Sequence, residues 1–206
     1  SDGDRHFARL HRSLAAVRIA PPMSDAALAQ VIRETVRRNR LGDATVYVQI
    51  SRGPAPRDHL FPPAPQPTVI VTAKRMKRPD PQAYAEGVDV VTAPDIRWLK
   101  CEIKSISLLP NVLAKQAAQE QGAYEAWLLR EGEVVTEASA SNAFIVDAEG
   151  VLRTHPLSPV ILGGVTRSVV LDLARAEGVP VAERAFTTAE IAAAREAFLT
   201  STSSWV

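Results

Sequence analysis

The stretch IKSISLLPNVLAKQ, residues 103–116, organises the rest of the chain. It places Lys104 at the end of a mainly apolar run that begins at Ile96, and Pro110 and an amphipathic segment follow. We expect a strand that ends at Lys104 and a helix over about 111–121. Burial of a lysine stem lowers the pKa of its amine, and the neutral amine is the form that Schiff-base chemistry needs. A lysine at a strand end is also a common surface feature, because its amine reaches water while its stem covers apolar side chains.

The composition of the 206 residues excludes several classes of protein. A formal net charge of +1 gives no overall basic field for nucleic acid or an anionic membrane. The single cysteine, Cys101, excludes an internal disulfide framework, and no pair of histidines has the spacing of metal ligands. No stretch approaches the ~18–20 apolar residues of a membrane span, and the start lacks a signal-peptide core. We therefore expect a cytoplasmic protein with no nucleic-acid, membrane or metal partner.

The first half of the chain predicts two helices and then two strands. Apolar residues at spacings of three and four, from Phe7 to Val17, predict a helix that Pro21-Pro22 ends. Ser24 is a suitable cap for a second helix that ends near Asn39 to Gly42. The apolar stripe expected to be buried on this second helix consists of Leu28, Val31, Ile32, Thr35 and Val36.

Alternating residues then predict a half-buried strand over Ala44 to Arg52, with Tyr47 on its polar face. Glycine and prolines make 53–59 a loop, and a second strand follows over Thr68 to Thr72. The two prolines within Arg78 to Gln82 mark a linker. The chain is therefore expected to form two domains, over residues 1–79 and 80–206.

The second half of the chain predicts a sheet that is largely antiparallel. Turns at Glu131-Gly132 and Glu149-Gly150 separate apolar segments, as in hairpins. A helix should follow Gly163-Gly164, and a short helix from about Thr188 to Arg195 should lead to a last strand, Ala197 to Thr200. The expected strands before these helices are Glu125–Leu129, Val134–Glu137 and Phe144–Val146.

Several short motifs carry groups that could bind a charged ligand. The turn from Gly163 to Thr166 precedes a helix, whose electropositive N-terminus could bind a phosphate, and the pair Ser201-Thr202 could assist. Glu137 opens a run of small and polar residues, where its carboxylate could pair with a cationic ring nitrogen. Arg57 and His59 stand two apart in an extended loop, so both could clamp a carboxylate. Ordinary turn chemistry, a solvated glutamate and a charged surface loop explain the same residues without a ligand.

Taken together, these residues resemble the fold-type IV pyridoxal-phosphate enzymes, the group of branched-chain and D-amino-acid aminotransferases and aminodeoxychorismate lyase. Four ordered blocks carry the resemblance over nearly the whole chain: 103–116, 136–142, 163–167 and 199–202. The resemblance implies a two-domain fold of the α/β (α+β) class. It has a small N-terminal α/β domain and a larger C-terminal domain with a pseudo-barrel of mostly antiparallel strands.

The resemblance also implies roles for single residues around the cofactor pyridoxal 5′-phosphate. Lys104 would form the Schiff base and then move a proton at the substrate Cα, and Glu137 would keep the ring nitrogen protonated. Leu162 would pack near the ring. Arg9, in the first helix, matches the family's phosphate-binding arginine, and only the resemblance identifies it. The other residues implied in cofactor binding are Val165, Thr166, Ser201 and Thr202.

Within the family, the strand from Val46 to Gly53 and the loop after it are similar to the D-amino-acid aminotransferase subgroup. Arg57 and His59 would bind the substrate α-carboxylate, and Tyr47 would line the same pocket. Because this loop reaches the partner's active site in the family, a homodimer is implied. The expected reaction is reversible amino transfer between a D-amino acid, such as D-alanine, and a 2-oxo acid, such as 2-oxoglutarate.

Two alternatives remain open at this point. One is another chemistry of the same fold: transamination of branched-chain L-amino acids or (R)-amines, or a lyase reaction. The other is a silent protein that binds the cofactor without turnover. The second alternative arises because family members carry segments before the position of Ser1 and after that of Val206, so the small domain is expected to lack its first strands.

Overall fold

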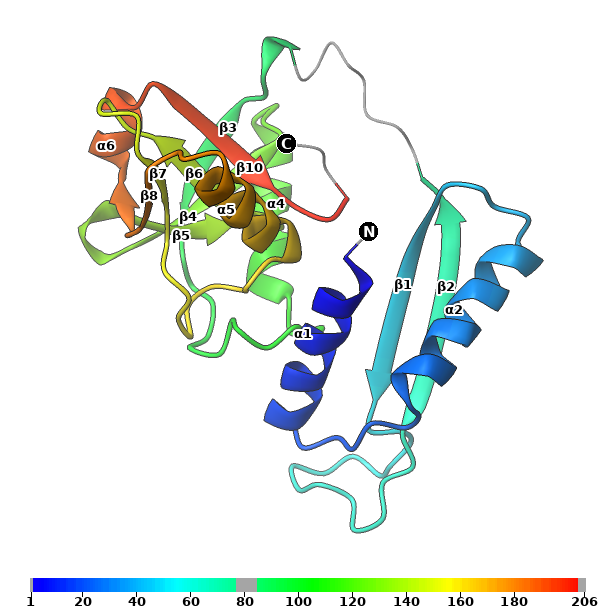
Figure 1. Ribbon diagram of the computed structural model, residues 1–206. Coiled ribbons are helices and arrows are strands. Elements are labelled where there is room, and N and C mark those ends of the chain that lie inside the picture. The colour runs from blue at the N-terminus through cyan, green and yellow to red at the C-terminus, as the bar shows by residue number, and fades with distance from the viewer. Residues whose placement is uncertain (1, 77–84, 204–206) are drawn as a thin grey trace. The chain divides into compact units, whose positions relative to one another are not determined.

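The computed structural model describes residues 2–76 and 85–203 (Figure 1). The chain divides into two compact units, one formed by His6–Arg78 and the other by Ser1–Arg5 together with Pro79–Val206. The boundary expected between residues 79 and 80 lies outside the described residues.

The unit His6–Arg78 combines two helices with a two-stranded antiparallel hairpin. Helix α2 packs against strand β2, and Leu28 is its buried residue. The side chain of Ser24 caps α2 by accepting a hydrogen bond from the Ala27 N–H at 3.3 Å, as the sequence predicts. The expected stripe is only partly buried, because Val31 is 39% exposed. The elements of this unit are α1 (Gly3–Ala16), α2 (Asp25–Arg38), β1 (Ala44–Ser51) and β2 (Thr68–Arg75).

The loop between β1 and β2 is closed by a glycine that no other residue could replace. Gly53 has φ +91°, and an added Cβ would lie 1.9 Å from the carbonyl oxygen of Gln66. Arg52 donates a hydrogen bond to the Arg18 carbonyl at 3.0 Å, and its guanidinium lies 3.7 Å from the ring centroid of Phe61. The loop predicted over 53–59 is confirmed, and it extends to the start of β2.

The larger unit contains two four-stranded sheets, in the orders β3-β4-β5-β9 and β10-β6-β7-β8. The pairs β3–β4 and β7–β8 are parallel and the others are antiparallel. No helix in the described part of the chain is long and apolar enough to cross a membrane. The elements are β3 (Val90–Pro94), α4 (Leu109–Glu120), β4 (Glu125–Arg130), η1 (Glu131–Glu133), β5 (Val134–Ala138), β6 (Asn142–Val146), β7 (Leu152–Thr154), α5 (Val165–Ala176), β8 (Val181–Glu183), β9 (Phe186–Thr187), α6 (Thr188–Ala193) and β10 (Glu196–Thr200).

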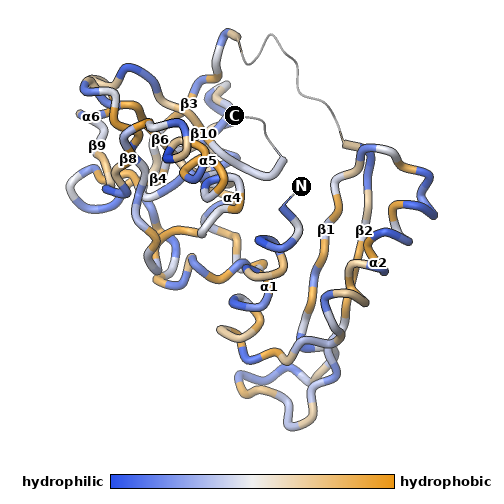
Figure 2. Tube along the Cα trace, in the orientation of Figure 1, coloured by the Kyte–Doolittle hydropathy of each residue, from blue (hydrophilic) through white to orange (hydrophobic). Residues whose placement is uncertain are grey.

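Both sheets contribute to one buried core, as a barrel-like arrangement requires. Trp127 from β4 packs edge-to-face on Phe186 from β9, with ring centroids 5.8 Å apart. Ala143 and Ile145 from the other sheet belong to the same cluster. A second cluster around Phe144 lies under α5. Figure 2 shows hydrophobic and hydrophilic stretches mixed along the strands and helices of this unit. The core fixes the strands that carry the candidate site.

The prediction of a strand that ends at Lys104 is wrong. Strand β3 ends at Pro94, and the backbone from there to α4 is irregular. After the Asp95 N–H, which donates to the Leu129 carbonyl of β4 at 2.7 Å, the backbone hydrogen bonds of this segment close turns or reach other loops: the Cys101 N–H donates to the Pro159 carbonyl at 2.7 Å. Ile96 is 68% exposed, so the apolar run does not line the core. Lys104 is exposed as well, so the prediction that its stem is buried is also wrong. The four short strands that the sequence did not predict are β3, β7, β8 and β9.

Candidate active site

A buried carboxylate is the centre of the candidate site. Glu137 lies on β5 and is 5% exposed. The Leu162 N–H donates to both carboxylate oxygens, at 3.1 and 3.0 Å, and the Asn142 side-chain amide donates to Oε2 at 2.9 Å. The guanidinium of Arg97 donates to Oε1. A charged group can stay this deeply buried only because such partners replace water.

Arg97 itself is held by a second buried carboxylate. Its Nε and Nη2 donate to the two oxygens of Asp95, each at 2.9 Å, which is the bidentate geometry of an arginine–carboxylate pair. The side chains of Arg97 and Asp95 are 4% and 0% exposed. Arg130 and the Thr136 hydroxyl also donate to Asp95, at 3.0 and 2.9 Å. Asp95, Arg97 and Glu137 therefore form a continuous buried ionic network, which we call the carboxylate network.

The pKa values in this network follow from burial and pairing. Burial raises the pKa of Glu137 to about 7, although the charge and hydrogen bond of Arg97 oppose the shift. Burial also acts to raise the pKa of Asp95, but hydrogen bonds led by that from Arg97 outweigh it and lower the value to about 2. Burial acts to lower the pKa of Arg97, and its two carboxylate partners raise it instead. Arg97 thus stays charged, and Glu137 titrates close to neutral pH.

The N-terminus of α5 lies next to this network. The helix begins at Val165, and its N-cap residue, Gly164, provides no side-chain cap. A Cβ at position 164 would lie 2.1 Å from Oδ1 of Asn142, so only glycine fits there. The Thr166 hydroxyl donates to the Ser201 carbonyl at 3.0 Å, which ties the segment after β10 to the helix start. The site offers an anion an electropositive helix end that no side chain caps.

The structure connects five of the residues predicted from sequence in the larger unit: Glu137, Leu162, Val165, Thr166 and Ser201. No described contact joins Thr202, which is exposed, to this group. In the other unit, Arg9 is half-buried, with its Nη2 3.5 Å from Nδ1 of His6. Tyr47 is exposed and donates to Oε1 of Gln49 at 2.8 Å, and both Arg57 and His59 are exposed in the loop.

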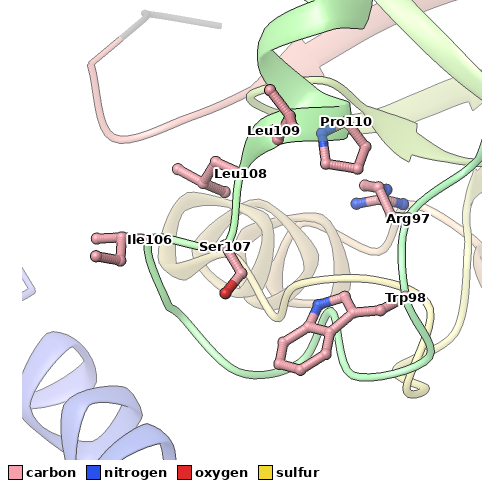
Figure 3. A pocket seen from close by; sticks show the side chains of 7 residues that line it. All are labelled: Arg97, Trp98, Ile106, Ser107, Leu108, Leu109 and Pro110. Carbon is pink, nitrogen blue, oxygen red and sulfur yellow. The ribbon is translucent and has the colours of Figure 1, made fainter. Parts of the chain in front are cut away.

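Lys104 lies in the segment between two stretches that line a pocket of about 330 Å³. Figure 3 shows Arg97 and Trp98 on one side of this pocket and the backbone from Ile106 to Pro110 on the other. Apolar groups dominate the lining. Within the described residues, no group of three or more His, Cys, Asp or Glu side chains could hold a metal ion.

Sequence reasoning assigned no role to Arg97, Asp95 or Asn142. The block Asp95-Ile96-Arg97 could have given a signal, because two opposite charges stand two apart inside an apolar run. Such charges are rarely buried unless they are paired. The partner of Arg97 lies 40 residues away, at Glu137, and this separation leaves no local trace in the sequence.

The whole chain, residues 1–206, matches the family model for amino-transferase class IV. The chain belongs to this family. This class IV aminotransferase is 40% identical to the D-alanine aminotransferase of Bacillus licheniformis over 203 residues, which cover 98% of the chain and 71% of that protein. It is also 40% identical to a D-alanine aminotransferase of Listeria monocytogenes, over 97% of the chain and 69% of that protein.

Solved structures give the same fold. A branched-chain amino acid aminotransferase solved with pyridoxamine 5′-phosphate superposes with a TM-score of 0.87 and 27% identity, over 98% of this chain and 67% of that one. A branched-chain aminotransferase of Thermoproteus uzoniensis with norvaline gives a TM-score of 0.83 and 29% identity, over 97% and 67%. The expected fold of type IV enzymes is thereby confirmed.

Proposed function

We propose that this class IV aminotransferase uses pyridoxal 5′-phosphate to transfer an amino group reversibly between a D-amino acid and a 2-oxo acid. D-Alanine and 2-oxoglutarate are the substrates we expect. The observation that carries this proposal is the 40% identity to D-alanine aminotransferases over 98% and 97% of the chain. The Arg-x-His pair at 57 and 59, an arrangement suited to a substrate carboxylate, supports it.

The residues of the site fit this cofactor. A buried carboxylate at Glu137 suits a cationic ring nitrogen, because the ring charge would offset the burial of the carboxylate. The uncapped start of α5 and the glycine at 164 suit a phosphate. The cofactor, when bound, supplies an electron sink next to the substrate Cα. A relative of the same fold was solved with pyridoxamine 5′-phosphate.

Each side chain then has a defined task. The amine of Lys104 would hold the cofactor and would be the group that carries the proton at the substrate Cα. Glu137 would keep the ring nitrogen in its charged form, and Leu162, whose N–H donates to Glu137, would pack beside the ring. The residues that we assign to the phosphate are Val165, Thr166, Ser201, Thr202 and Arg9.

Substrate recognition is assigned to the loop after β1. Arg57 and His59 are exposed there and stand on alternate positions, so an extended backbone presents both in the same direction. The arginine fork pairs with the two oxygens of the substrate α-carboxylate, and His59 donates a further hydrogen bond. Tyr47, exposed on β1, lines the same pocket.

We also infer a homodimer and a cytoplasmic location. Large apolar side chains are exposed along residues 96–113, and an exposed apolar patch of this kind is typical of an interface. The exposed apolar residues of this segment are Ile96, Trp98, Leu99, Ile106, Leu108, Leu109, Val112 and Leu113.

Transamination of branched-chain L-amino acids is the second candidate, because solved branched-chain aminotransferases share the fold at 27% and 29% identity. A substrate panel separates the two functions. The cofactor-loaded protein is given 2-oxoglutarate with D-alanine, L-alanine, L-leucine or an (R)-amine. Turnover with D-alanine alone supports the proposal, and turnover with L-leucine alone refutes it.

Two variants test the carboxylate assignment within the same assay. Loss of the arginine fork in Arg57→Gln should raise KM for D-alanine by roughly 10- to 100-fold, since a charge-assisted hydrogen bond contributes about 1.5–3 kcal/mol. Arg33→Gln makes the same chemical change on an exposed face of α2 and should leave KM unchanged. An equal effect of both substitutions would contradict the role of Arg57.

A further inference from the structure

We propose that Arg97 is a positioning residue of this enzyme: anchored by Asp95, its guanidinium holds the Glu137 carboxylate in place and in its charged form. The inference rests on the proposed function, in which Glu137 faces the ring nitrogen of the cofactor. It adds two residues, Arg97 and Asp95, that act on the bound cofactor through Glu137.

The geometry divides the guanidinium of Arg97 between two partners. One edge, Nε and Nη2, is bound to both oxygens of Asp95 at 2.9 Å, and the remaining nitrogen, Nη1, donates to Glu137. Nη2 also donates to the Val160 carbonyl at 3.0 Å. Asp95 is fixed in turn by Thr136, at 2.9 Å. The donor to Glu137 therefore has no freedom to turn away.

The charge environment of Glu137 is simple. Among the described residues, the charged groups that most affect the pKa of Glu137 are Arg97 and Asp95, both on the segment that follows β3. The other two partners, the Leu162 N–H and the Asn142 amide, are neutral donors. Arg97 thus supplies a positive charge that acts against the effect of burial on Glu137.

Loss of this cation has two consequences for Glu137. A buried carboxyl group without a paired cation binds a proton, and a neutral carboxylic acid cannot attract a cationic ring nitrogen. The side chain also loses one of its fixed contacts, so it can move away from the Leu162 N–H. Lysine could restore the charge, but a single ammonium lacks the planar fork that joins Asp95 and Glu137.

The test measures Glu137 directly, in the full chain without substrate. The protein carries ¹³C-labelled glutamate carboxyl groups, and Glu137→Gln identifies the Glu137 signal. In Arg97→Met we expect the titration midpoint of Glu137 to rise by about one pH unit or more. The Leu162 amide should exchange with solvent about tenfold faster, because its acceptor is displaced.

Arg130→Met is the matched control, because Arg130 also donates to Asp95, at 3.0 Å, but does not contact Glu137 in the carboxylate network. It should move the midpoint by less than about a third of a unit, since a more distant charge acts weakly. Equal shifts in Arg97→Met and Arg130→Met, or no shift in either, would overturn the proposal.

If Arg97→Met does not fold, the same two measurements are made on Arg97→Lys. We expect its midpoint to stay within about half a unit of the wild type, because the charge is retained. Its Leu162 amide should still exchange faster, and wild-type exchange in this variant would refute the positioning role. Both readouts are independent of turnover. If the wild type transfers the amino group of D-alanine but the Arg97 variants show none of these changes, only this inference is refuted. If the variants show the changes but the wild type transfers no amino group, only the proposed function is refuted.

Discussion

A Cβ atom at position 164 would lie 2.1 Å from Oδ1 of Asn142, so Gly164 packs directly against that side chain. The same asparagine donates from Nδ2 to Glu137 and to the Leu162 carbonyl, both at 2.9 Å. The start of α5 and the buried carboxylate are therefore linked through one amide. Any residue larger than glycine at 164 must displace it.

Gly164→Ala should consequently weaken both stability and cofactor binding. The added methyl group forces Asn142 away from Glu137, at a cost of about 1–3 kcal/mol in the free energy of unfolding. Urea denaturation and titration with pyridoxal phosphate measure the two effects. Gly42→Ala is the control: nothing lies within 4 Å of an added Cβ at this position, so both quantities should change little. Wild-type behaviour of Gly164→Ala would show that Asn142 is not required.

Lys104→Ala should abolish covalent cofactor binding and amino transfer but leave the fold intact. Lys104 is exposed in an irregular segment, and substitutions at such positions change the free energy of unfolding by no more than about 0.5 kcal/mol. Mass spectrometry after borohydride reduction detects the covalent adduct, and thermal unfolding monitors the fold. Lys100→Ala, another exposed lysine of the same segment, should retain both the adduct and the activity. Amino transfer at the wild-type rate in Lys104→Ala would refute the assignment.

The raised pKa of Glu137 predicts that the free energy of unfolding falls as the pH rises toward 7. Because the folded pKa is raised to about 7, the folded protein keeps a proton that the unfolded chain releases above its lower, ordinary value. Stability contributed by this proton is complete at low pH and is lost as the pH rises to about 7, by roughly 3 kcal/mol in total.

Glu137→Gln provides the comparison, since an amide does not titrate. Urea denaturation of both proteins without cofactor at about pH 5 and pH 7.5 should show a steeper loss of stability in the wild type. Asp95 does not contribute to this range, because its pKa is about 2. Parallel pH dependence in the two proteins would mean that Glu137 does not titrate near pH 7.

A charge in the exposed apolar segment should dissociate the inferred dimer. Leu109, at the start of α4, is 69% exposed, so Leu109→Glu is compatible with the fold of the single chain. A buried, unpaired charge in an interface is strongly unfavourable, so sedimentation velocity should detect monomers. Leu173→Glu, at an exposed leucine of α5, should remain dimeric. A dimer that survives Leu109→Glu would place the interface elsewhere.

Local chemistry explains why much of the fold could be predicted from sequence. Ser24 caps α2 because a serine oxygen satisfies the first helical N–H groups, and this requirement is visible in a few neighbouring residues. The alternation of apolar and polar residues over Ala44 to Arg52 predicted β1 in the same way. Strands such as β9, which contains only Phe186 and Thr187, are too short to produce any periodicity.

The segment before Lys104 shows why the rest could not be predicted. Its apolar residues suggested a buried strand, but the backbone there turns after Pro94 because Asp95 and Arg97 bind each other and reach distant partners. The ion pair with Glu137 joins the segment after β3 to β5, two strands across the same sheet, and no local pattern encodes this pairing. The phosphate-binding role proposed for Arg9 came from family resemblance alone, and it stays a prediction.

The stereochemistry of the product distinguishes a D-amino-acid aminotransferase from an L-specific one. The cofactor-loaded protein is incubated with D-alanine and 2-oxoglutarate, and the glutamate formed is separated on a chiral column. We predict D-glutamate and pyruvate in equal amounts, and no glutamate when L-alanine replaces D-alanine. Formation of L-glutamate, or turnover with L-amino acids alone, would contradict the assignment as a D-amino-acid aminotransferase.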